Sequence, residues 1–548
     1  MTRHGGKLLV DQLVVHGADT VFSVPGESFH AVLDGLYDAP IRLITCRHEA
    51  GAANMADAYG KLTGRPGIAV VTRGPGATHA SVGVHTAFQD STPLILLVGQ
   101  VASDQVEREA FQEVDYRRMF GPMAKWVAQI DRTDRIPEYV ARAFSTACAG
   151  RPGPVVLALP EDMLAGETDA ADALPFHAVQ PYPGAEQIEA LRGMLERAER
   201  PLAILGGAGW SARTAQDMRA FLEANAIPAG AAFRRQDSLD NDSPSYVGDV
   251  GIGINPKLAA RVRESDLLLV VGPRLGEMTT SGYTLLEPPT PMQPLVHVHP
   301  GAEELGRVYR AELPILSGME HFAAAVRKLR VEPRWREWTA AARTDYEAWQ
   351  QHGPMPGALD LGDCVAHLRE RVPDAIVTNG AGNFSVWAHR FWRWHDHGTQ
   401  AAPTSGAMGY GVPAAVAAKA VSPDRTVICF AGDGDFLMSG QELATAVQHD
   451  LPILVIVVNN GMYGTIRMHQ ERHFPGRVIG TELVNPDFAA YARAFGAHGE
   501  TVTSTAEFAG ALDRALASGG SALLELQIDP EAINPRTTLS AIRAEASR

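Results

Sequence analysis

The chain has 548 residues, of which 45% are hydrophobic and 20% charged, an ordinary soluble composition with room for three or four domains. Its formal net charge of −15 without a basic stripe argues against nucleic acid or an anionic membrane as a partner. No apolar run approaches a membrane span, no signal-peptide core follows the N-terminus, and the four cysteines lack paired spacing. We therefore expect a cytoplasmic protein with neither a membrane nor a nucleic-acid partner.

Apolar runs alternate with helical patterns along the whole chain, which predicts an α/β fold with doubly wound parallel sheets. We expect three such domains, the second of them Rossmann-like, with a helix and linker before the third. Their predicted ranges are 1–170, 187–331, 332–358 for the linker, and 359–548. The clearest predicted strands are 20–24, 42–45, 68–72, 94–98, 155–159, 375–378, 427–430, 453–458 and 523–528.

In the first domain, Glu49 follows a predicted strand and heads an Ala-rich helix. An acid in the first turn of a helix is commonly there because the helix dipole stabilises it. From the residues alone, this structural explanation is favoured over a functional one.

In the third domain, polar clusters follow two consecutive apolar runs: Gly-Asp-Gly-Asp-Phe at 432–436 and Asn-Asn at 459–460. The carboxyl ends of parallel strands form the edge where open α/β sheets bind ligands. The Asp433 carboxylate and the Asn460 amide oxygen suit Mg²⁺, and the glycines let backbone N–H groups approach phosphate oxygens. A helix at 441–448 is expected to point its N-terminus at the anion. A simple turn after a buried strand is the alternative.

The stretch from Asp433 to Asn460 resembles the GDG…NN signature of thiamine diphosphate (ThDP) enzymes. The resemblance implies that Asp433, Asn460 and the carbonyl of Met462 bind Mg²⁺. It also implies that Glu49 matches the family's glutamate, which hydrogen-bonds the pyrimidine ring of the cofactor and activates it. The first domain would then bind the pyrimidine and the third domain the diphosphate. The cofactor contacts implied in the third domain are Ala381, Gly382, Asn383, Phe384, Gly406, Met408, Gly432, Asp433, Gly434, Asp435, Asn460 and Met462.

Met408 lies in a segment, 404–411, that is similar to the part of the family in which a large apolar residue wedges under the cofactor. A buried core methionine is the ordinary alternative. Glu49 and the diphosphate residues fall in different domains, and the family shares each site between two subunits. The resemblance therefore implies a homodimer or homotetramer with shared active sites.

The segment 110–115 resembles the AFQE segment of acetolactate synthases, the acetohydroxyacid synthase large-subunit and pyruvate oxidase-like branch. The resemblance implies catalytic roles for Phe111, Gln112 and the pocket lysine Lys125, although a solvated loop and helix face would also explain Gln112 and Lys125. The implied reaction is ThDP- and Mg²⁺-dependent decarboxylation of a 2-oxo acid with carboligation to a second carbonyl. The alternatives are a simple 2-oxo acid decarboxylase or 2-hydroxyacyl lyase acting on a larger substrate, and a catalytically silent cofactor-binding scaffold.

Two departures from the family pattern concern the substrate and a second cofactor. His469 stands where acetolactate synthases carry a tryptophan that shapes the acceptor pocket, so the acceptor is left open. Arg467 and His473 suit an anionic or larger substrate, or an exposed helix face. The segment 272–277 resembles a flavin-contacting segment, but 247–251 lacks the accompanying Gly-Met-His run and His299 replaces the usual aspartate. FAD is therefore an open possibility.

Overall fold

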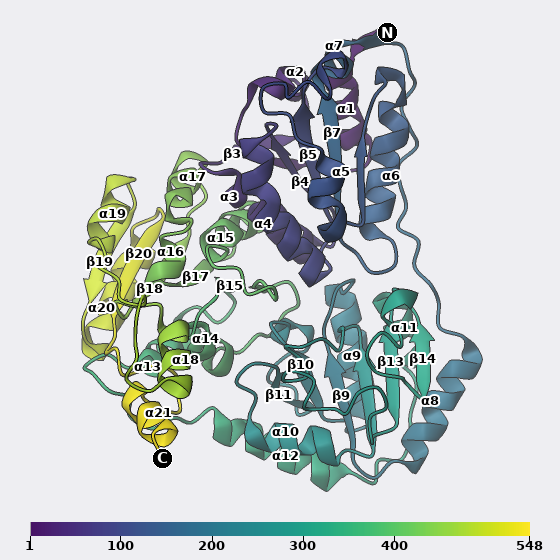
Figure 1. Cartoon of the computed structure of the whole chain (residues 1–548). Coiled ribbons are helices and arrows are strands. Elements are labelled where there is room, and N and C mark those ends of the chain that lie inside the picture. The colour runs from purple at the N-terminus through teal and green to yellow at the C-terminus, as the bar shows by residue number, and fades with distance from the viewer. Residues whose placement is uncertain (1) are drawn as a thin grey trace.

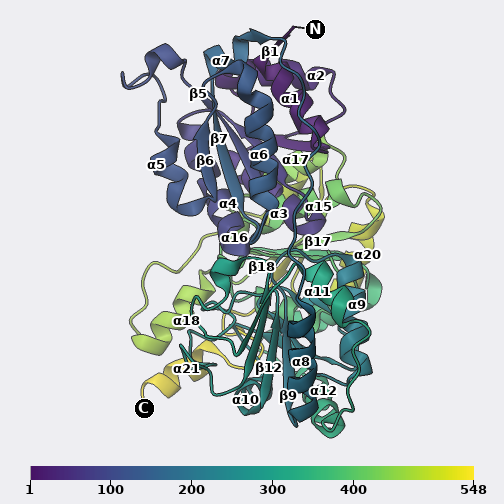
Figure 2. The same cartoon turned by 90° about the vertical axis from the view of Figure 1, so that its right-hand side faces the viewer.

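Three six-stranded sheets organise the chain, and the computed structural model describes residues 2–548. Every neighbouring pair of strands within these three sheets is parallel, and helices cover the sheets, so the predicted α/β class is confirmed. Figures 1 and 2 show the three lobes, with the N-terminal lobe at the top and the central lobe below it.

The first sheet has the strand order β3-β2-β4-β5-β7-β6. Its inner strands are uninterrupted apolar runs because helices cover both faces of a parallel sheet. The strands are β2 (Thr20–Ser23), β3 (Arg42–Thr45), β4 (Gly67–Val71), β5 (Leu94–Gln100), β6 (Trp126–Gln129) and β7 (Pro154–Pro160), with a small antiparallel pair of β1 (Arg3–His4) and β8 (Glu167–Thr168). The helices are α1 (Gly5–Val15), α2 (His30–Tyr37), α3 (Glu49–Thr63), α4 (Pro75–Asp90), α5 (Tyr116–Phe120), α6 (Ile136–Cys148) and α7 (Glu161–Ala165).

The central sheet has the order β11-β10-β9-β12-β13-β14. Its strands are β9 (Pro201–Leu205), β10 (Ala229–Ala232), β11 (Tyr246–Val250), β12 (Leu267–Val271), β13 (Leu295–His299) and β14 (Leu313–Leu316). The helices are α8 (Ala185–Arg197), α9 (Ala212–Ala224), α10 (Pro256–Glu264), α11 (Met319–Val326) and α12 (Arg336–Trp349). Helix α12 lies within the predicted linker, and its Tyr346 packs edge-on against Tyr246 of β11, which ties this segment to the central core.

The third sheet has the order β16-β15-β17-β18-β20-β19. Its strands are β15 (Ile376–Asn379), β16 (Gln400–Ala401), β17 (Val427–Gly432), β18 (Leu454–Asn459), β19 (His498–Val502) and β20 (Ala522–Gln527). The helices are α13 (Leu361–Arg371), α14 (Ser385–Phe391), α15 (Gly411–Val421), α16 (Asp433–Phe436), α17 (Leu443–Gln448), α18 (Gly464–His473), α19 (Phe488–Ala494), α20 (Thr505–Ala517) and α21 (Leu539–Ala546), with a 3₁₀ turn at Gly440–Glu442.

The N-terminal and C-terminal lobes pack on each other through α3 and α15, which lie side by side in Figure 1. A small residue makes the close approach of the lobes possible: a Cβ on Gly51 of α3 would come within 2.4 Å of Glu442 Oε1 in the C-terminal lobe. The hydrophobic core is continuous across the contact, running from Ala52 and Met55 to Ala414 and Ala415. The two lobes of one chain therefore form a single packed unit.

A buried polar cluster lies in the same contact. Lys61 of α3 forms ion pairs with Asp57 and Asp90, and donates to the carbonyl of Ala402 in the C-terminal lobe. Tyr410 donates to Asp57 at 2.6 Å. Because buried charges are costly unless they are paired and hydrogen-bonded, this cluster favours one relative placement of the two lobes.

Within residues 2–548, no helix is both long enough and apolar enough to cross a bilayer.

Candidate active site

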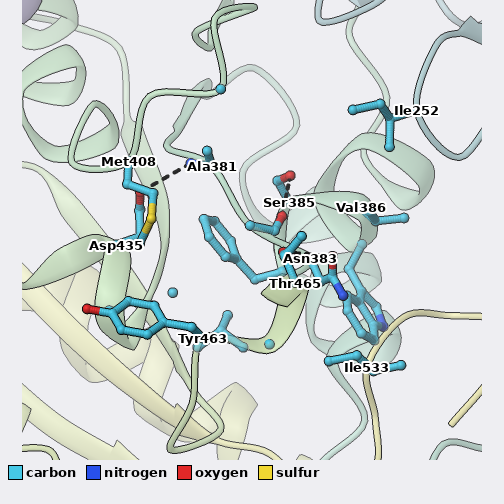
Figure 3. A pocket seen from close by; sticks show the side chains of 18 of the residues that line it. Ile252, Ala381, Asn383, Ser385, Val386, Met408, Asp435, Tyr463, Thr465 and Ile533 are labelled. Atoms are coloured by element: carbon cyan, nitrogen blue, oxygen red, sulfur yellow. Dashed lines mark hydrogen bonds between the residues drawn. The ribbon is translucent and has the colours of Figure 1, made fainter. Parts of the chain in front are cut away.

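A cavity of about 390 Å³ opens at the carboxyl ends of β15, β17 and β18, between the C-terminal and central lobes. Figure 3 shows part of its wall, with Met408, Asp435 and Tyr463 on one side and Ile252 of the central lobe on the other. All the cofactor contacts expected in the third domain line this one cavity: Ala381, Gly382, Asn383, Phe384, Gly406, Met408, Gly432, Asp433, Gly434, Asp435, Asn460 and Met462.

Three oxygen donors suited to a divalent cation lie on the cavity wall: Asp433, Asn460 and Met462. Asp433 begins α16, directly after β17, and burial raises the pKa of its carboxyl. Asn460 follows β18, and Gly461, with φ 69°, makes the left-handed turn that leads to Met462. This donor set fits Mg²⁺ by its chemistry, since hard cations take carboxylate, amide and carbonyl oxygens.

The Asp433 carboxylate is oriented by Asn485, a residue that the sequence analysis did not identify. Asn485 Nδ2 donates to Asp433 Oδ2 at 2.8 Å and to Asn459 Oδ1 at 2.9 Å. Asn485 lies in a loop with no motif around it, so only the folded structure brings it to the end of β18.

Glycines leave room on the cavity wall where a diphosphate would approach the backbone. A Cβ on Gly432 would lie 2.8 Å from the Phe384 ring, and one on Gly434 would lie 2.5 Å from the Tyr463 ring. Asn383 is fixed by Thr465, whose hydroxyl donates to Asn383 Oδ1 at 2.9 Å. The bare backbone at these glycines forms a cradle on the cavity wall, which fits an anionic ligand bound by backbone N–H groups.

Asp435 joins two loops of the cavity. Its Oδ1 accepts hydrogen bonds from Gly409 N at 2.9 Å and Ala381 N at 3.1 Å. Burial raises the pKa of this carboxyl to about 7, against the lowering effect of the two hydrogen bonds and of Arg234. Asp435 therefore braces the Ala381 loop against the loop that carries Met408, and it is placed to shape the cavity through the backbone.

The helix nearest the cation donors is α16, whose first residues Asp433, Gly434 and Asp435 line the cavity. The segment 441–448, which the sequence predicted to aim at the anion, forms a 3₁₀ turn and α17, and contributes no lining residue. The chain becomes helical directly at Asp433. The prediction that a helix at 441–448 points its N-terminus at the anion is therefore wrong.

Glu49 does not line this cavity but lies on the face formed by the carboxyl ends of the first sheet's strands. Glu49 starts α3 and its Oε2 is 2.9 Å from His79 Nδ1. Gln112 shares this face: a Cβ on Gly76 would lie 3.3 Å from Glu49 Oε1, and one on Gly74 would lie 2.8 Å from the Gln112 Cβ. The loops after β3, β4 and β5 thus bring Glu49 and Gln112 to one sheet edge, next to Phe111, which is 74% exposed.

The turn that presents Glu49 is held by Glu442 of the C-terminal lobe. Glu442 is fully buried, and its Oε1 accepts from His48 N at 2.9 Å and Arg47 N at 3.2 Å. Thr445 donates to its Oε2 at 2.6 Å. The lobe that carries the diphosphate cradle therefore also fixes the start of α3 in the same chain.

Lys125 lies apart from the other predicted catalytic residues. It precedes β6, at the amino edge of the first sheet, whereas Glu49 and Gln112 lie at the carboxyl edge. Its Nζ donates to Thr146 O and Ala149 O, each at 2.6 Å, at the C-terminal end of α6, and burial lowers its pKa to about 8. This position gives the predicted catalytic role no structural support and indicates a helix-capping role.

Helix α18 carries Arg467, His469 and His473, the residues considered above with the departures from the family pattern. His469 and His473 are stacked with ring centroids 6.1 Å apart, and Arg467 donates to the buried Glu471 at 3.1 Å. Arg543 of α21 also binds Glu471, so Arg467 belongs to a structural ion cluster. None of Arg467, His469 and His473 lines the cavity, whereas Thr465 and Ile466 do.

Comparison with protein families gives matches to three models that together cover most of the chain. Residues 3–119 match the N-terminal TPP binding domain of thiamine pyrophosphate enzymes, 188–326 the central domain, and 380–526 the C-terminal TPP binding domain. Each matched range contains most strands of one of the three sheets.

Curated relatives are similar over nearly the full length. The chain is 33% identical over 534 residues to the acetolactate synthase isozyme 2 large subunit of Escherichia coli, covering 96% of each chain. It is 32% identical to the acetolactate synthase large subunit of Parasynechococcus marenigrum, covering 92% of this chain and 84% of that one. It is 30% identical to a probable acetolactate synthase large subunit of Methanocaldococcus jannaschii.

The raised pKa of Asp435 predicts a pH effect on stability. Between the ordinary carboxyl value of 3.8 and about 7, the folded apoprotein keeps a proton that the unfolded chain has lost, so stability should fall as pH rises through this window. Asp435→Asn keeps an acceptor oxygen but cannot ionise. We expect its urea midpoint to fall less than that of the wild type from pH 4 to 7. The exposed Asp34→Asn is the control, and parallel profiles for D435N and wild type would contradict the assignment.

Proposed function

This chain belongs to the thiamine pyrophosphate enzyme family and is a thiamine diphosphate-dependent enzyme, and from that premise we propose that it decarboxylates a 2-oxo acid and joins the remaining fragment to a second carbonyl. One observation carries the proposal. The cation donors, the glycine cradle and Met408 line a single cavity, while Glu49 and Gln112 share a separate face.

We assign the cofactor contacts by the chemistry of these groups. Asp433, Asn460 and the carbonyl of Met462 would hold Mg²⁺, and the loop from Ala381 to Phe384 would meet the diphosphate. Thiamine diphosphate supplies, when bound, an electron sink for the bond that breaks as a 2-oxo acid loses CO₂. Glu49 would hydrogen-bond the pyrimidine ring, and Met408 would support the rings from below.

Carboligation is proposed as the fate of the fragment because the matched relatives are named acetolactate synthases. The cavity continues past the cradle along apolar residues, including Ile252 and Met278 of the central lobe, where a second carbonyl compound could lie. A simple decarboxylase or 2-hydroxyacyl lyase is the second candidate, favoured by the absence of the family's tryptophan at His469.

We propose that the enzyme is a homodimer or a homotetramer in which two subunits complete each site. Glu49 does not line the cavity of its own chain, so a cofactor in that cavity would meet the glutamate of another copy. Exposed apolar side chains beside the cation donors support a protein partner there: Met438 is 51% exposed and Val484 fully exposed. Leu437, next to Met438, is also exposed.

A second cavity, of about 400 Å³, is proposed to bind FAD. It lies at the ends of β9 and β12, lined by Gly207, Gly272 and Arg274, and shares Phe233 and Thr404 with the first cavity. Glycine at position 207 lets the turns after β9 and β12 pack closely at this end, since a Cβ there would meet Gly272 O at 2.0 Å. The purified protein should then show a flavin absorption spectrum. A colourless protein that releases no flavin on denaturation would remove FAD from the proposal.

Pyruvate turnover tests the proposed reaction. With ThDP and Mg²⁺, the wild type should release CO₂ from pyruvate or another 2-oxo acid and form an acyloin-type product such as acetolactate. Release of the aldehyde alone would favour the decarboxylase, and no CO₂ from any 2-oxo acid would defeat both candidates.

Glu49→Gln isolates the role of the glutamate. It should bind ThDP with an affinity close to that of the wild type but lose turnover by on the order of 100-fold or more, because general acid–base assistance is removed. Calorimetry and CO₂ release measure the two effects. Glu186, an exposed acid in the first turn of α8, provides the matched Glu186→Gln control. Unchanged kcat in E49Q would reject the role.

A further inference from the structure

Arg234 brings a buried cation to the wall of the cofactor cavity. It follows β10 of the central lobe, at the carboxyl edge of that sheet, and is only 5% exposed. Its neighbours on the wall include Phe233, Thr404 and Met408, so it faces the side of the cavity that the central lobe closes. No sequence motif marks this position.

The guanidinium keeps hydrogen-bonding capacity for a ligand. Its Nη1 donates to the carbonyl of Pro403, and no hydrogen bond within residues 2–548 uses its Nη2, so the guanidinium keeps a donor for a ligand in the cavity. Asp90 and Asp435 act on Arg234 only as charges at a distance. Neither carboxylate forms an ion pair with Arg234 within residues 2–548: Asp90 binds Lys61 and Thr404, and Asp435 Oδ1 accepts from two backbone N–H groups. A guanidinium that lines a cavity and has no carboxylate paired with it favours an anionic ligand there.

The backbone at Arg234 is held in an unusual conformation, which sets the direction of the side chain. Arg234 has φ 59°, a left-handed conformation that residues with a side chain rarely adopt. The next residue but one fixes the turn: Gln236 N donates to Gln400 Oε1 at 2.8 Å, and Gln400 Nε2 donates to Gln236 Oε1 at 2.6 Å. Conformations of this kind persist where the surroundings over-determine them, commonly at ligand sites.

Arg234 is the one cation that residues 2–548 contribute to the cavity wall. The other basic lining residue is His389, which is bound to Asn379 Oδ1 at 3.0 Å; burial lowers its pKa well below the usual value, so it is neutral. Burial lowers the pKa of Arg234 to about 10, which leaves it charged at neutral pH. An anion in this cavity therefore has a single fixed positive partner apart from a bound metal ion.

We propose that Arg234 binds the carboxylate of the acceptor 2-oxo acid and makes the enzyme prefer acids over aldehydes as acceptors. This inference rests on the proposed function. A planar guanidinium with free N–H groups matches a carboxylate geometrically. The donor's carboxylate is lost as CO₂, so stabilising its charge would oppose the reaction, whereas the acceptor's carboxylate persists in the product. The cofactor diphosphate is the other anion, and its charge is met by Mg²⁺ and the backbone cradle.

The product ratio from one donor and two competing acceptors tests the inference. Isotopically labelled pyruvate serves as donor and as acid acceptor, giving acetolactate labelled in both halves. Unlabelled acetaldehyde serves as the neutral acceptor, giving acetoin labelled in one half. In Arg234→Met, the acetolactate-to-acetoin ratio should fall by about 10- to 100-fold, the range expected for a lost charged hydrogen bond. The rate of CO₂ release in the first turnover, which precedes acceptor binding, and the Kd for ThDP should stay within about twofold of the wild type.

Matched variants decide between the outcomes. Arg213→Met, on exposed α9, should leave the ratio unchanged, and Arg234→Lys, which keeps a positive charge, should lower it less than R234M and serves if R234M does not fold. An unchanged ratio in R234M or R234K overturns the inference, and so does a weaker Kd for ThDP, which would assign Arg234 to the diphosphate. Wild type that releases no CO₂ at all would instead refute the proposed function.

Discussion

The rest of the structure depends on the hydrogen bonds between the Glu442 side chain and the backbone just before α3. A fully buried carboxylate of the C-terminal lobe accepts the N–H groups of Arg47 and His48, and so fixes the direction in which Glu49 leaves the first sheet. Each N–H left without this partner would cost about 1–3 kcal/mol. The C-terminal lobe therefore carries the diphosphate cradle and also orients Glu49, the glutamate proposed to act in the site of another subunit.

The packing of α3 on α15 holds this arrangement in place, and in the proposed function a second chain then completes the site. Gly51 lets the C-terminal lobe approach α3 closely, and the buried Lys61 cluster favours one placement of the two lobes. Glu49 consequently cannot swing towards the cavity of its own chain without breaking buried contacts. In this account the same packing that stabilises the subunit creates the need for a second subunit, and it leaves the central lobe to close the cavity with Arg234.

The sequence was sufficient to predict which residues meet where their places along adjacent strands determine their places in the fold. Asp433 and Asn460 follow adjacent parallel strands, so their convergence could be predicted, and so could the α/β class from its alternating pattern. Arg234 and Asn485 could not be predicted, because they reach the cavity from loops whose placement depends on how lobes and loops pack. Lys125 shows the reverse problem. Its local match to a family segment does not reveal that it lies at the opposite edge of the sheet from Glu49.

The central claim is that two copies of the chain complete one active site, and mixed subunits test it most directly. Glu49→Gln and Asp433→Asn subunits, each inactive alone, would be unfolded together and reassembled in equal amounts. Half of the dimers should be mixed, and each mixed dimer should hold one intact site out of two, giving about a quarter of wild-type CO₂ release. A mixture no more active than its separate components would contradict the shared site.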